Sequence, residues 1–223
     1  MIRSLLQTTS PVFFGYVPMG MAFGVLFQDL GHPWWYATLM GLVIFAGSAQ
    51  FLAVGLIAAG AGWVEVFLST FLLNARHLFY GLSMLKRYGQ WGLRKLYLIF
   101  GLTDETYALI SSMAVTDPSQ SEKKYFWITL FNQSYWVLGC TLGALLGAVL
   151  PFDTQGMEFV MTALFTVLLI EQYQRLKEST PLLVAALSSL LIIIILPEHM
   201  LTGSILLTLS ILAILHRLPK DNA

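Results

Sequence analysis

The sequence predicts an all-α membrane protein, a polytopic helical bundle with about seven or eight hydrophobic segments, some of them kinked or discontinuous. Of its 223 residues, 57% are hydrophobic and only 11% are charged, and the mean hydropathy is +0.74. A soluble domain of this size carries about 25% charged residues. The hydrophobic runs mix Leu, Phe and Gly without a period of two, which favours helices over strands.

Charge and cysteine content narrow the possible functions. The net charge is zero, so nothing electrostatic points to nucleic acid as a partner. The single cysteine, Cys140, lies in an apolar run, so we expect no intrachain disulfide, no metal cluster and no cofactor. Residues 1–7 are interpreted as the lead-in to a first span rather than as a removed signal peptide. We predict a single transmembrane domain over residues 1–223.

The first predicted span runs from Pro11 to Phe27. Pro18 in its interior removes one backbone hydrogen bond and favours a kink. Gly20 and Gly24 lie four residues apart, a spacing typical of helices that pack closely in membranes.

The second segment, Trp34 to Gly60, has no charged residue. As one straight helix it would be about 40 Å long, against a hydrocarbon core of ~30 Å. Its middle, Gly47 to Gln50, combines small and polar residues, and a helix can unwind at such a patch to offer backbone groups to a substrate. The alternative is a tight helix crossing in which Gln50 forms a hydrogen bond to its neighbour.

A third helix, Ser69 to Leu85, is apolar but carries Asn74, Arg76 and His77 near its middle. On a helical wheel, one half is apolar and the other half is polar or small. An arginine at mid-bilayer costs roughly 2.5–3.5 kcal/mol on insertion scales, which makes it a candidate functional residue. A structural ion pair or a side chain reaching the interface is the alternative. The candidate partner is the acidic pair Asp104 and Glu105.

That acidic pair lies at the centre of the next segment, Leu96 to Thr116. Ten of the twelve basic residues fall in four places: residues 86–95, 123–124, 175–177 and 217–220. If the segment crossed the membrane, these would divide four against six. If it entered and left on one side, all ten would lie together, as the positive-inside rule prefers. We therefore predict a discontinuous element with Asp104 and Glu105 at its apex.

A long span follows from Tyr125 to Leu150, with Asn132 and Gln133 in its first half. Gly139, Gly143 and Gly147 form a ridge of small residues at a spacing of four, which indicates close packing against another helix. Three further hydrophobic segments follow, over residues 158–173, 182–196 and 201–215. The last two carry almost no polar residue, so residues 180–217 are interpreted as scaffold.

Several stretches resemble the AzlC-type family, the large subunit of bacterial branched-chain amino acid exporters. The matching stretches are Gly15 to Gly24, Phe45 to Phe51, Asn74 to Tyr80, Leu102 to Glu105, and Gly143 with Gly147. They keep their order over about residues 10–170. The resemblance implies a multi-pass protein of the bacterial cell inner membrane. It also implies export of branched-chain amino acids, with methionine as a further candidate, and a small AzlD-type membrane subunit as partner.

We expect a polar substrate or ion pathway inside the bundle. The candidate residues are Gln50, Asn74, Arg76, His77, Tyr80, Asp104, Glu105, Asn132 and Gln133. A zwitterion needs a cationic contact, an anionic or dipolar contact and an apolar pocket, and one intramembrane arginine with one acidic pair fits that need. The favoured function is a secondary exporter driven by ion or proton exchange, with Asp104, Glu105 and His77 as candidates for the coupling.

Two other classes of function remain as alternatives. An intramembrane enzyme could use His77 with Asp104 or Glu105, but no metal-spaced His/Glu motif and no recognisable nucleophile motif is present. We therefore predict a protein that is not an enzyme. The other alternative is a channel, or a subunit that stabilises a partner without transport of its own. It would be favoured if the protein alone neither bound nor moved any solute.

Overall fold

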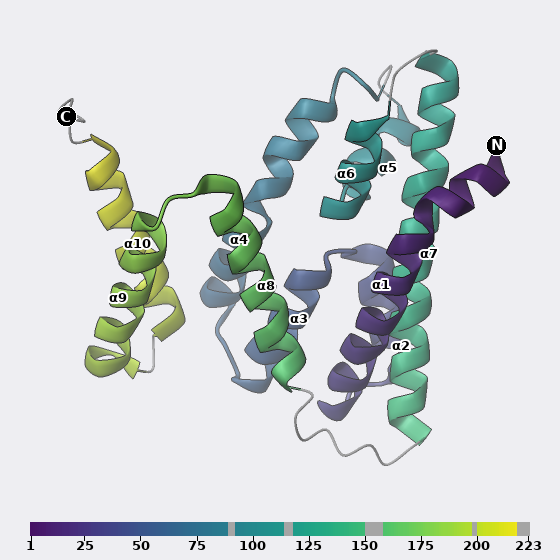
Figure 1. Ribbon diagram of the computed structural model, residues 1–223. Coiled ribbons are helices and arrows are strands. Elements are labelled where there is room, and N and C mark those ends of the chain that lie inside the picture. The colour runs from purple at the N-terminus through teal and green to yellow at the C-terminus, as the bar shows by residue number, and fades with distance from the viewer. Residues whose placement is uncertain (89–91, 114–117, 150–157, 198–199, 218–223) are drawn as a thin grey trace. The chain divides into compact units, whose positions relative to one another are not determined.

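The computed structural model describes residues 1–88, 92–113, 118–149, 158–197 and 200–217, and all of its regular structure there is helical. This confirms the predicted all-α class. The helices are α1 (Ile2–Asp29), α2 (Trp34–Val43), α3 (Gly47–Ala58), α4 (Trp63–Met84), α5 (Leu93–Phe100), α6 (Asp104–Ser112), α7 (Pro118–Val149), α8 (Glu158–Leu176), α9 (Thr180–Ile195) and α10 (Met200–Arg217), as Figure 1 shows.

Among the described helices, only α1 is both long enough and apolar enough to cross a membrane by length and composition. Three shorter apolar helices, α3, α9 and residues 200–215 of α10, fall below that length. The two segments predicted to be discontinuous are each divided into two helices, α2 with α3 and α5 with α6. The break within residues 34–60 therefore explains why α3 is too short to cross a membrane, although the whole segment is apolar.

The chain forms two compact units. The first unit comprises Met1–Gly60 and Leu73–Thr162, and the second comprises Ala61–Leu72 and Ala163–Ala223. In the second unit α9 packs against α10, where Gly203 lies against Ile192. All the contacts described below belong to the first unit. A single transmembrane domain over the whole chain remains a prediction, as does the scaffold role of residues 180–217.

The first unit is built around the contact between α1 and α7. Gly20 and Gly24 of α1 lie directly on the backbone of α7 at Gly139 and Gly143. Residue numbers rise together along the contact, so the two helices are parallel. Glycine allows this approach because it has no Cβ. Both predicted small-residue faces are therefore covered by each other, within one chain.

The predicted unwinding in residues 34–60 lies one turn earlier than we expected. The chain leaves the helix at Ile44–Ala46, and Gly47 to Gln50 form the first turn of α3. Phe45 has φ 45°, a left-handed conformation that is costly for a non-glycine residue. Its ring is buried and contacts Tyr16 and Phe100. Burial of the ring stabilises Phe45 in spite of its strained backbone, and the sequence does not show which rings will surround it.

Helices α2 and α3 run in opposite directions and form a hairpin. The start of α2 and the end of α3 therefore lie at the same end of the first unit. The contacts that set its direction are Thr38 with Thr141, Leu42 with Gln133, Phe45 with Tyr16, and Phe51 with Phe23. The first two make α2 antiparallel to α7, and the last two make α3 parallel to α1. The hairpin therefore starts and ends where α1 ends, beside Gly147 of α7.

The predicted discontinuity near Asp104 and Glu105 is confirmed. Helix α5 ends at Phe100, residues 101–103 are not helical, and the two carboxylate residues open α6. Thr103 caps α6, because its side chain accepts a hydrogen bond from the Thr106 amide at 3.2 Å. Such a cap satisfies one of the free N–H groups at a helix start.

Helices α5 and α6 form a second hairpin at the opposite end of the unit. Just after α4, the Arg87 guanidinium donates to the carbonyl oxygens of Ile110 and Ser111 at 3.1 and 3.3 Å, at the end of α6. Lys95, near the start of α5, donates to the Leu85 carbonyl at 2.8 Å. Both ends of the hairpin therefore lie beside the end of α4, and the N-terminal part of α7 lies there too (Figure 1).

This arrangement predicts the sidedness of three exposed positions. Single cysteines at Leu93, Gln120 and Ala59, each in a Cys140→Ala background, should react with an impermeant maleimide in two groups. Leu93 and Gln120 should label from the cytoplasmic side because the neighbouring basic residues favour it, and Ala59 should label from the other side. Labelling of Leu93 and Gln120 from opposite sides would show that residues 93–112 form an ordinary span.

Candidate functional site

Arg76 lies between the two helix breaks. Its Nη2 atom is 2.9 Å from Asp104 Oδ2 at the start of α6, and 3.4 Å from Ser48 Oγ at the start of α3. The structure thus brings Arg76 to the acidic pair that we proposed as its partner. The two side chains keep 30% and 34% of their surface accessible, so the ion pair is only partly buried. An ion pair that is not fully buried can be separated and can form again.

Glu105 is held by a different helix. The hydroxyl of Tyr16, on α1, lies 2.5 Å from Glu105 Oε2 and 2.8 Å from Thr103 Oγ1. Tyr16 is buried, whereas Glu105 is exposed. The two neighbouring carboxylates therefore have separate partners, Arg76 from α4 and Tyr16 from α1.

Two of the predicted site residues, Asn132 and Gln50, are completely buried and lie beside the first turns of the two half-helices. Asn132 Nδ2 donates to Thr106 Oγ1 of α6 at 2.9 Å. Gln50, in α3, accepts from Trp136 Nε1 at 2.8 Å. Both breaks are thus tied to α7. The bond to Trp136 also matches the alternative interpretation of Gln50, as a residue bonded across a helix contact.

Gln133 has a different environment. Its Oε1 accepts from the Tyr97 hydroxyl at 2.7 Å, and its Nε2 donates to the Leu42 carbonyl at 3.0 Å. The side chain therefore links α5 to the last turn of α2. A direct place in a substrate pathway remains a prediction for Gln133, and its contacts are those of a residue that holds the two hairpins together.

His77, Asn74 and Tyr80 lie on α4 around the arginine. Nδ1 of His77 lies 3.3 Å from the Asn74 carbonyl oxygen within the same helix, and its ring meets Tyr80 edge-on. The ring of Tyr80 stacks on Tyr107 of α6 at 4.5 Å. These hydrogen-bond and ring contacts of His77 therefore lie within α4.

The two breaks meet through aromatic side chains. Phe45, inside the first break, and Phe100, just before the second, have ring centroids 6.5 Å apart. Phe45 is buried, whereas Phe100 is 42% exposed. An apolar surface therefore lies between the same two breaks that Arg76 joins.

Several buried polar atoms of this region have no hydrogen-bond partner among the described residues. They are Arg76 Nε, Asp104 Oδ1 and Asn132 Oδ1. Buried polar groups are almost always paired in folded proteins. One donor, on Arg76, and two acceptors, on Asp104 and Asn132, therefore lack a hydrogen-bond partner among the described residues.

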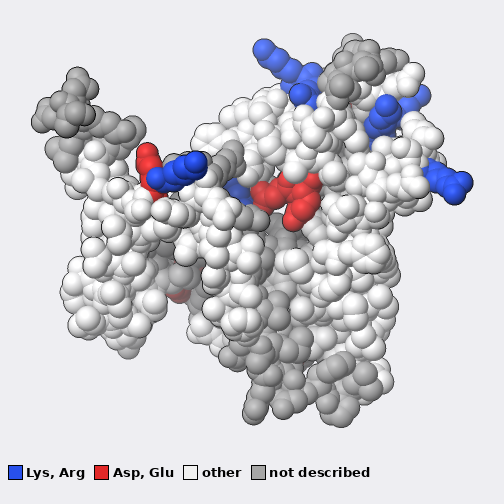
Figure 2. Space-filling view, viewed as in Figure 1, with Lys and Arg blue, Asp and Glu red and all other residues white. Residues whose placement is uncertain are grey.

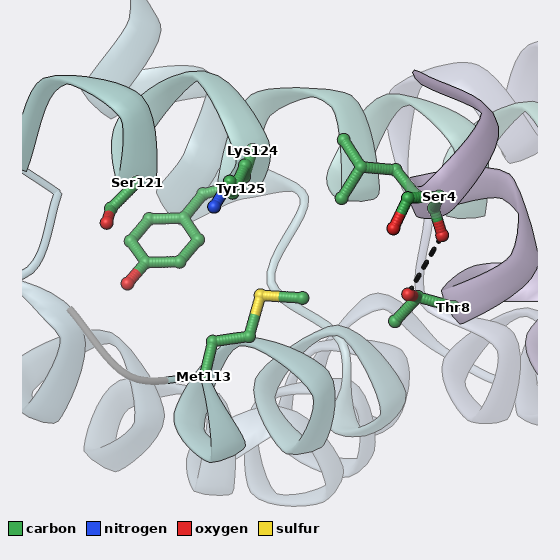
Figure 3. A pocket seen from close by; sticks show the side chains of 7 residues that line it. Ser4, Thr8, Met113, Ser121, Lys124 and Tyr125 are labelled. Atoms are coloured by element: carbon green, nitrogen blue, oxygen red, sulfur yellow. Dashed lines mark hydrogen bonds between the residues drawn. The ribbon is translucent and has the colours of Figure 1, made fainter. Parts of the chain in front are cut away.

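Charge is sparse on the rest of the face shown in Figure 2. Most of its described surface is uncharged, Lys and Arg gather mainly at one end, and acidic side chains appear near the centre beside a small basic area. Near the basic residues of α7, a cavity of about 330 Å³ is lined by Ser4, Leu5, Thr8, Met113, Ser121, Lys124 and Tyr125 (Figure 3). None of the nine predicted site residues lines this cavity, so we do not assign the site to it.

In the described part of the chain, no group of three or more His, Cys, Asp or Glu side chains is arranged to hold a metal ion. The polar residues that do converge are suited to a small organic solute with both charges.

Sequence reasoning did not select four residues that contact the site. They are Tyr16, Ser48, Thr106 and Trp136. Tyr16 and Ser48 fall within the stretches that carry the family resemblance, Gly15 to Gly24 and Phe45 to Phe51, and this was a usable signal. Thr106 and Trp136 had no comparable signal, because their roles depend on which helices pack together.

The fold and the site define a class: a helical membrane protein whose charged residues lie between two interrupted helices. The family model of the AzlC protein matches residues 11–150, and the chain belongs to the AzlC family. It is a multi-pass protein of the cell inner membrane.

Named relatives agree with this assignment. The branched-chain amino acid transport protein AzlC of Bacillus subtilis is 40% identical over 178 residues, covering 79% of this chain and 69% of that protein. An uncharacterised membrane protein of Helicobacter pylori is 45% identical over 167 residues, 75% of this chain and 73% of the relative. The inner membrane protein YgaZ of Escherichia coli is 31% identical over 189 residues, covering 80% of this chain and 76% of that protein. No solved structure matches the chain.

Proposed function

We propose that this chain is the transporting subunit of a secondary exporter of branched-chain amino acids, with methionine as a further substrate. The observation that carries the proposal is the accessible Arg76–Asp104 ion pair between two helix breaks. Interrupted helices at a polar centre are a common design of secondary transporters. The name of the Bacillus subtilis relative supports the substrate class.

A zwitterion can replace the internal ion pair without leaving a charge unpaired. The substrate carboxylate would take the Arg76 guanidinium, and the substrate ammonium would take Asp104. Separating an ion pair without replacing either partner would leave both charges unpaired, whereas here each partner receives a new counter-ion. The accessible ring of Phe100, beside Phe45, would contact the branched side chain.

Coupling to an ion or proton would act on the same residues. A proton on Asp104 would remove the counter-charge of Arg76 and would favour a bound carboxylate there. Glu105 and His77 are the other candidates, and Glu105 is already connected to α1 through Tyr16. We also propose that a small AzlD-type membrane subunit assembles with this chain, as the family resemblance implies.

Counterflow in proteoliposomes tests this function. Vesicles preloaded with unlabelled leucine should accumulate labelled leucine, valine or methionine, with higher rates when the small subunit is co-purified. Labelled lysine serves as the control solute, because its second ammonium has no partner in the proposed site. Absence of counterflow for all three substrates, with the small subunit present, would contradict the proposed function. Full activity of the single chain would contradict only the need for the partner.

A further inference from the structure

The two neighbouring carboxylates of the site have partners of different chemistry. Asp104 pairs with the Arg76 guanidinium at 2.9 Å, a group that stays positively charged in proteins. Glu105 faces the hydroxyl of Tyr16 at 2.5 Å, and a tyrosine hydroxyl can donate or accept a hydrogen bond. A proton on Asp104 would leave Arg76 without its counter-charge, whereas a proton on Glu105 leaves each of these four groups with a partner.

The Tyr16 hydroxyl has one proton and two acceptors within reach. Glu105 Oε2 lies 2.5 Å away, and Thr103 Oγ1 lies 2.8 Å away. When Glu105 is ionised, its carboxylate accepts from Tyr16, because a charged acceptor forms the stronger hydrogen bond. When Glu105 is protonated, its own O–H can donate to the tyrosine oxygen, and Tyr16 then donates to Thr103. Tyr16 can therefore form a hydrogen bond to Glu105 in both protonation states.

Tyr16 is held rigidly, whereas Glu105 is not enclosed. The tyrosine side chain is 7% exposed, and its ring meets those of Phe45 and Trp136 edge-on, with centroids 6.5 and 5.5 Å apart. Glu105 is exposed, so the described residues do not shield it from protons. A fixed neutral hydroxyl beside an exposed carboxylate suits a proton that binds and leaves repeatedly.

A change at Tyr16 acts on the start of α6. Thr103 is the N-cap of this helix and accepts from the Thr106 amide at 3.2 Å. Its hydroxyl also donates to Thr106 Oγ1 at 3.0 Å, and the same oxygen accepts from Asn132 of α7 at 2.9 Å. Glu105 is thereby connected to a buried amide on α7 through hydroxyl groups alone. The protonation state of Glu105 can thus alter how α1 and α7 hold this break.

The charge balance around the break leaves room for one proton. Arg76 supplies one positive charge, and Asp104 and Glu105 supply two negative charges. His77 of α4 interacts electrostatically with both carboxylates, and the contact from α7 is the neutral amide of Asn132. While His77 is neutral, one negative charge is therefore in excess. A zwitterionic substrate does not change this sum, whereas a proton on Glu105 brings it to zero.

We infer that Glu105 carries the proton that drives transport, and that Tyr16 is its positioning residue. Tyr16 donates to the ionised carboxylate, accepts from the protonated one, and passes the change to Thr103 at the start of α6. Asp104 remains the partner of Arg76 and of the substrate ammonium. The role in transport rests on the proposed function, but the binding of a proton by Glu105 beside Tyr16 does not.

The first experiment compares two modes of transport in proteoliposomes. Leucine counterflow needs no net movement of protons, whereas accumulation of labelled leucine in response to an imposed pH gradient, applied in either direction, does. Glu105→Gln should lower gradient-driven accumulation about tenfold more than it lowers counterflow, because glutamine cannot bind or release a proton. The control Glu122→Gln, in α7 outside the site, should change the ratio of the two rates by less than about twofold. Equal losses in both modes for Glu105→Gln, or an undiminished response to the gradient, would overturn the inference and leave the exporter standing.

The second experiment detects the proton without transport. Infrared difference spectra of the purified protein are recorded over a pH series, and the C=O band of protonated carboxyl groups is followed. The part of this band that is lost in Glu105→Gln belongs to Glu105. In Tyr16→Phe, which keeps the ring, the half-point of that part should move to higher pH by about half a unit or more, because the ionised carboxylate loses the stronger hydrogen bond.

Tyr97→Phe is the matched control, because it removes a hydroxyl that is bonded to Gln133 at 2.7 Å and should leave the half-point unchanged. If the half-point is also unchanged in Tyr16→Phe, or if Glu105→Gln loses no carboxyl band, the inference is wrong even if leucine is transported. A half-point that shifts only in Tyr16→Phe, in a protein that moves no amino acid, would support the proton site and contradict the proposed function.

Discussion

Arg76→Ala is expected to reduce counterflow by about 10-fold or more. In the proposed mechanism Arg76 binds the substrate carboxylate, and losing a hydrogen bond to a charged group costs about 1.5–3 kcal/mol, which corresponds to roughly 10- to 150-fold. Here the loss leaves Asp104 without its cation and also removes a contact to Ser48. Arg76→Lys should fail similarly, because a lysine ammonium is a point charge without the planar fork of donors that arginine has.

The matched control is Arg94→Ala, which removes an arginine at an exposed position of α5 and should leave counterflow within about twofold of the wild type, as surface substitutions usually do. Rates are divided by the amount of folded protein, measured as the monodisperse fraction after detergent extraction. Full transport by a well-expressed Arg76→Ala protein would remove this residue from the mechanism.

Gly143→Leu should destabilise the first unit rather than an interface with another protein. A Cβ at Gly143 would overlap the backbone of Met21, and backbone atoms cannot move aside as the end of a side chain can. Overpacking costs about 1–3 kcal/mol and occasionally more. For a chain of this length that predicts a fall of the thermal midpoint by roughly 2–12 °C, measured by loss of monodisperse protein on heating.

Gly55→Leu is the matched control, because an added Cβ at Gly55 has no neighbour within 4 Å. The same substitution there should change the thermal midpoint by less than half as much. If Gly143→Leu kept the wild-type midpoint and lost only the small subunit, the α1–α7 contact would be wrong, and the glycine ridge would belong to the partner interface.

The paired glycine faces change the case for a second subunit. The sequence suggested that Gly20 with Gly24, and the ridge from Gly139 to Gly147, needed covering by some helix. The structure pairs them with each other. Covering these faces therefore requires no second subunit, and a small partner is favoured only by the family resemblance.

The sequence predicted the all-α class and the two helix breaks from composition and residue pattern. The class follows from composition, and the distribution of the basic residues predicts the break at Asp104 and Glu105, because ten of them lie on one side only if that segment does not cross the membrane. The break in the preceding segment was placed one turn late. The small residues Gly47 to Gln50 suggested the unwinding, but the helix is interrupted at Phe45, whose unfavourable φ is compensated by rings from α1 and α5.

By itself, the sequence determined that this is a helical membrane protein with a cation, an acidic pair and two interruptions in its apolar segments. It also identified Asp104 as the candidate partner of Arg76, because few ionisable residues occur within the apolar segments. Only the tertiary structure decided that Tyr16 holds Glu105, that Trp136 holds Gln50, and that the glycine faces close on each other. These choices depend on which helices become neighbours and in which direction they run. Residues up to 126 positions apart are brought together in that way, and helical periodicity carries no information over such separations.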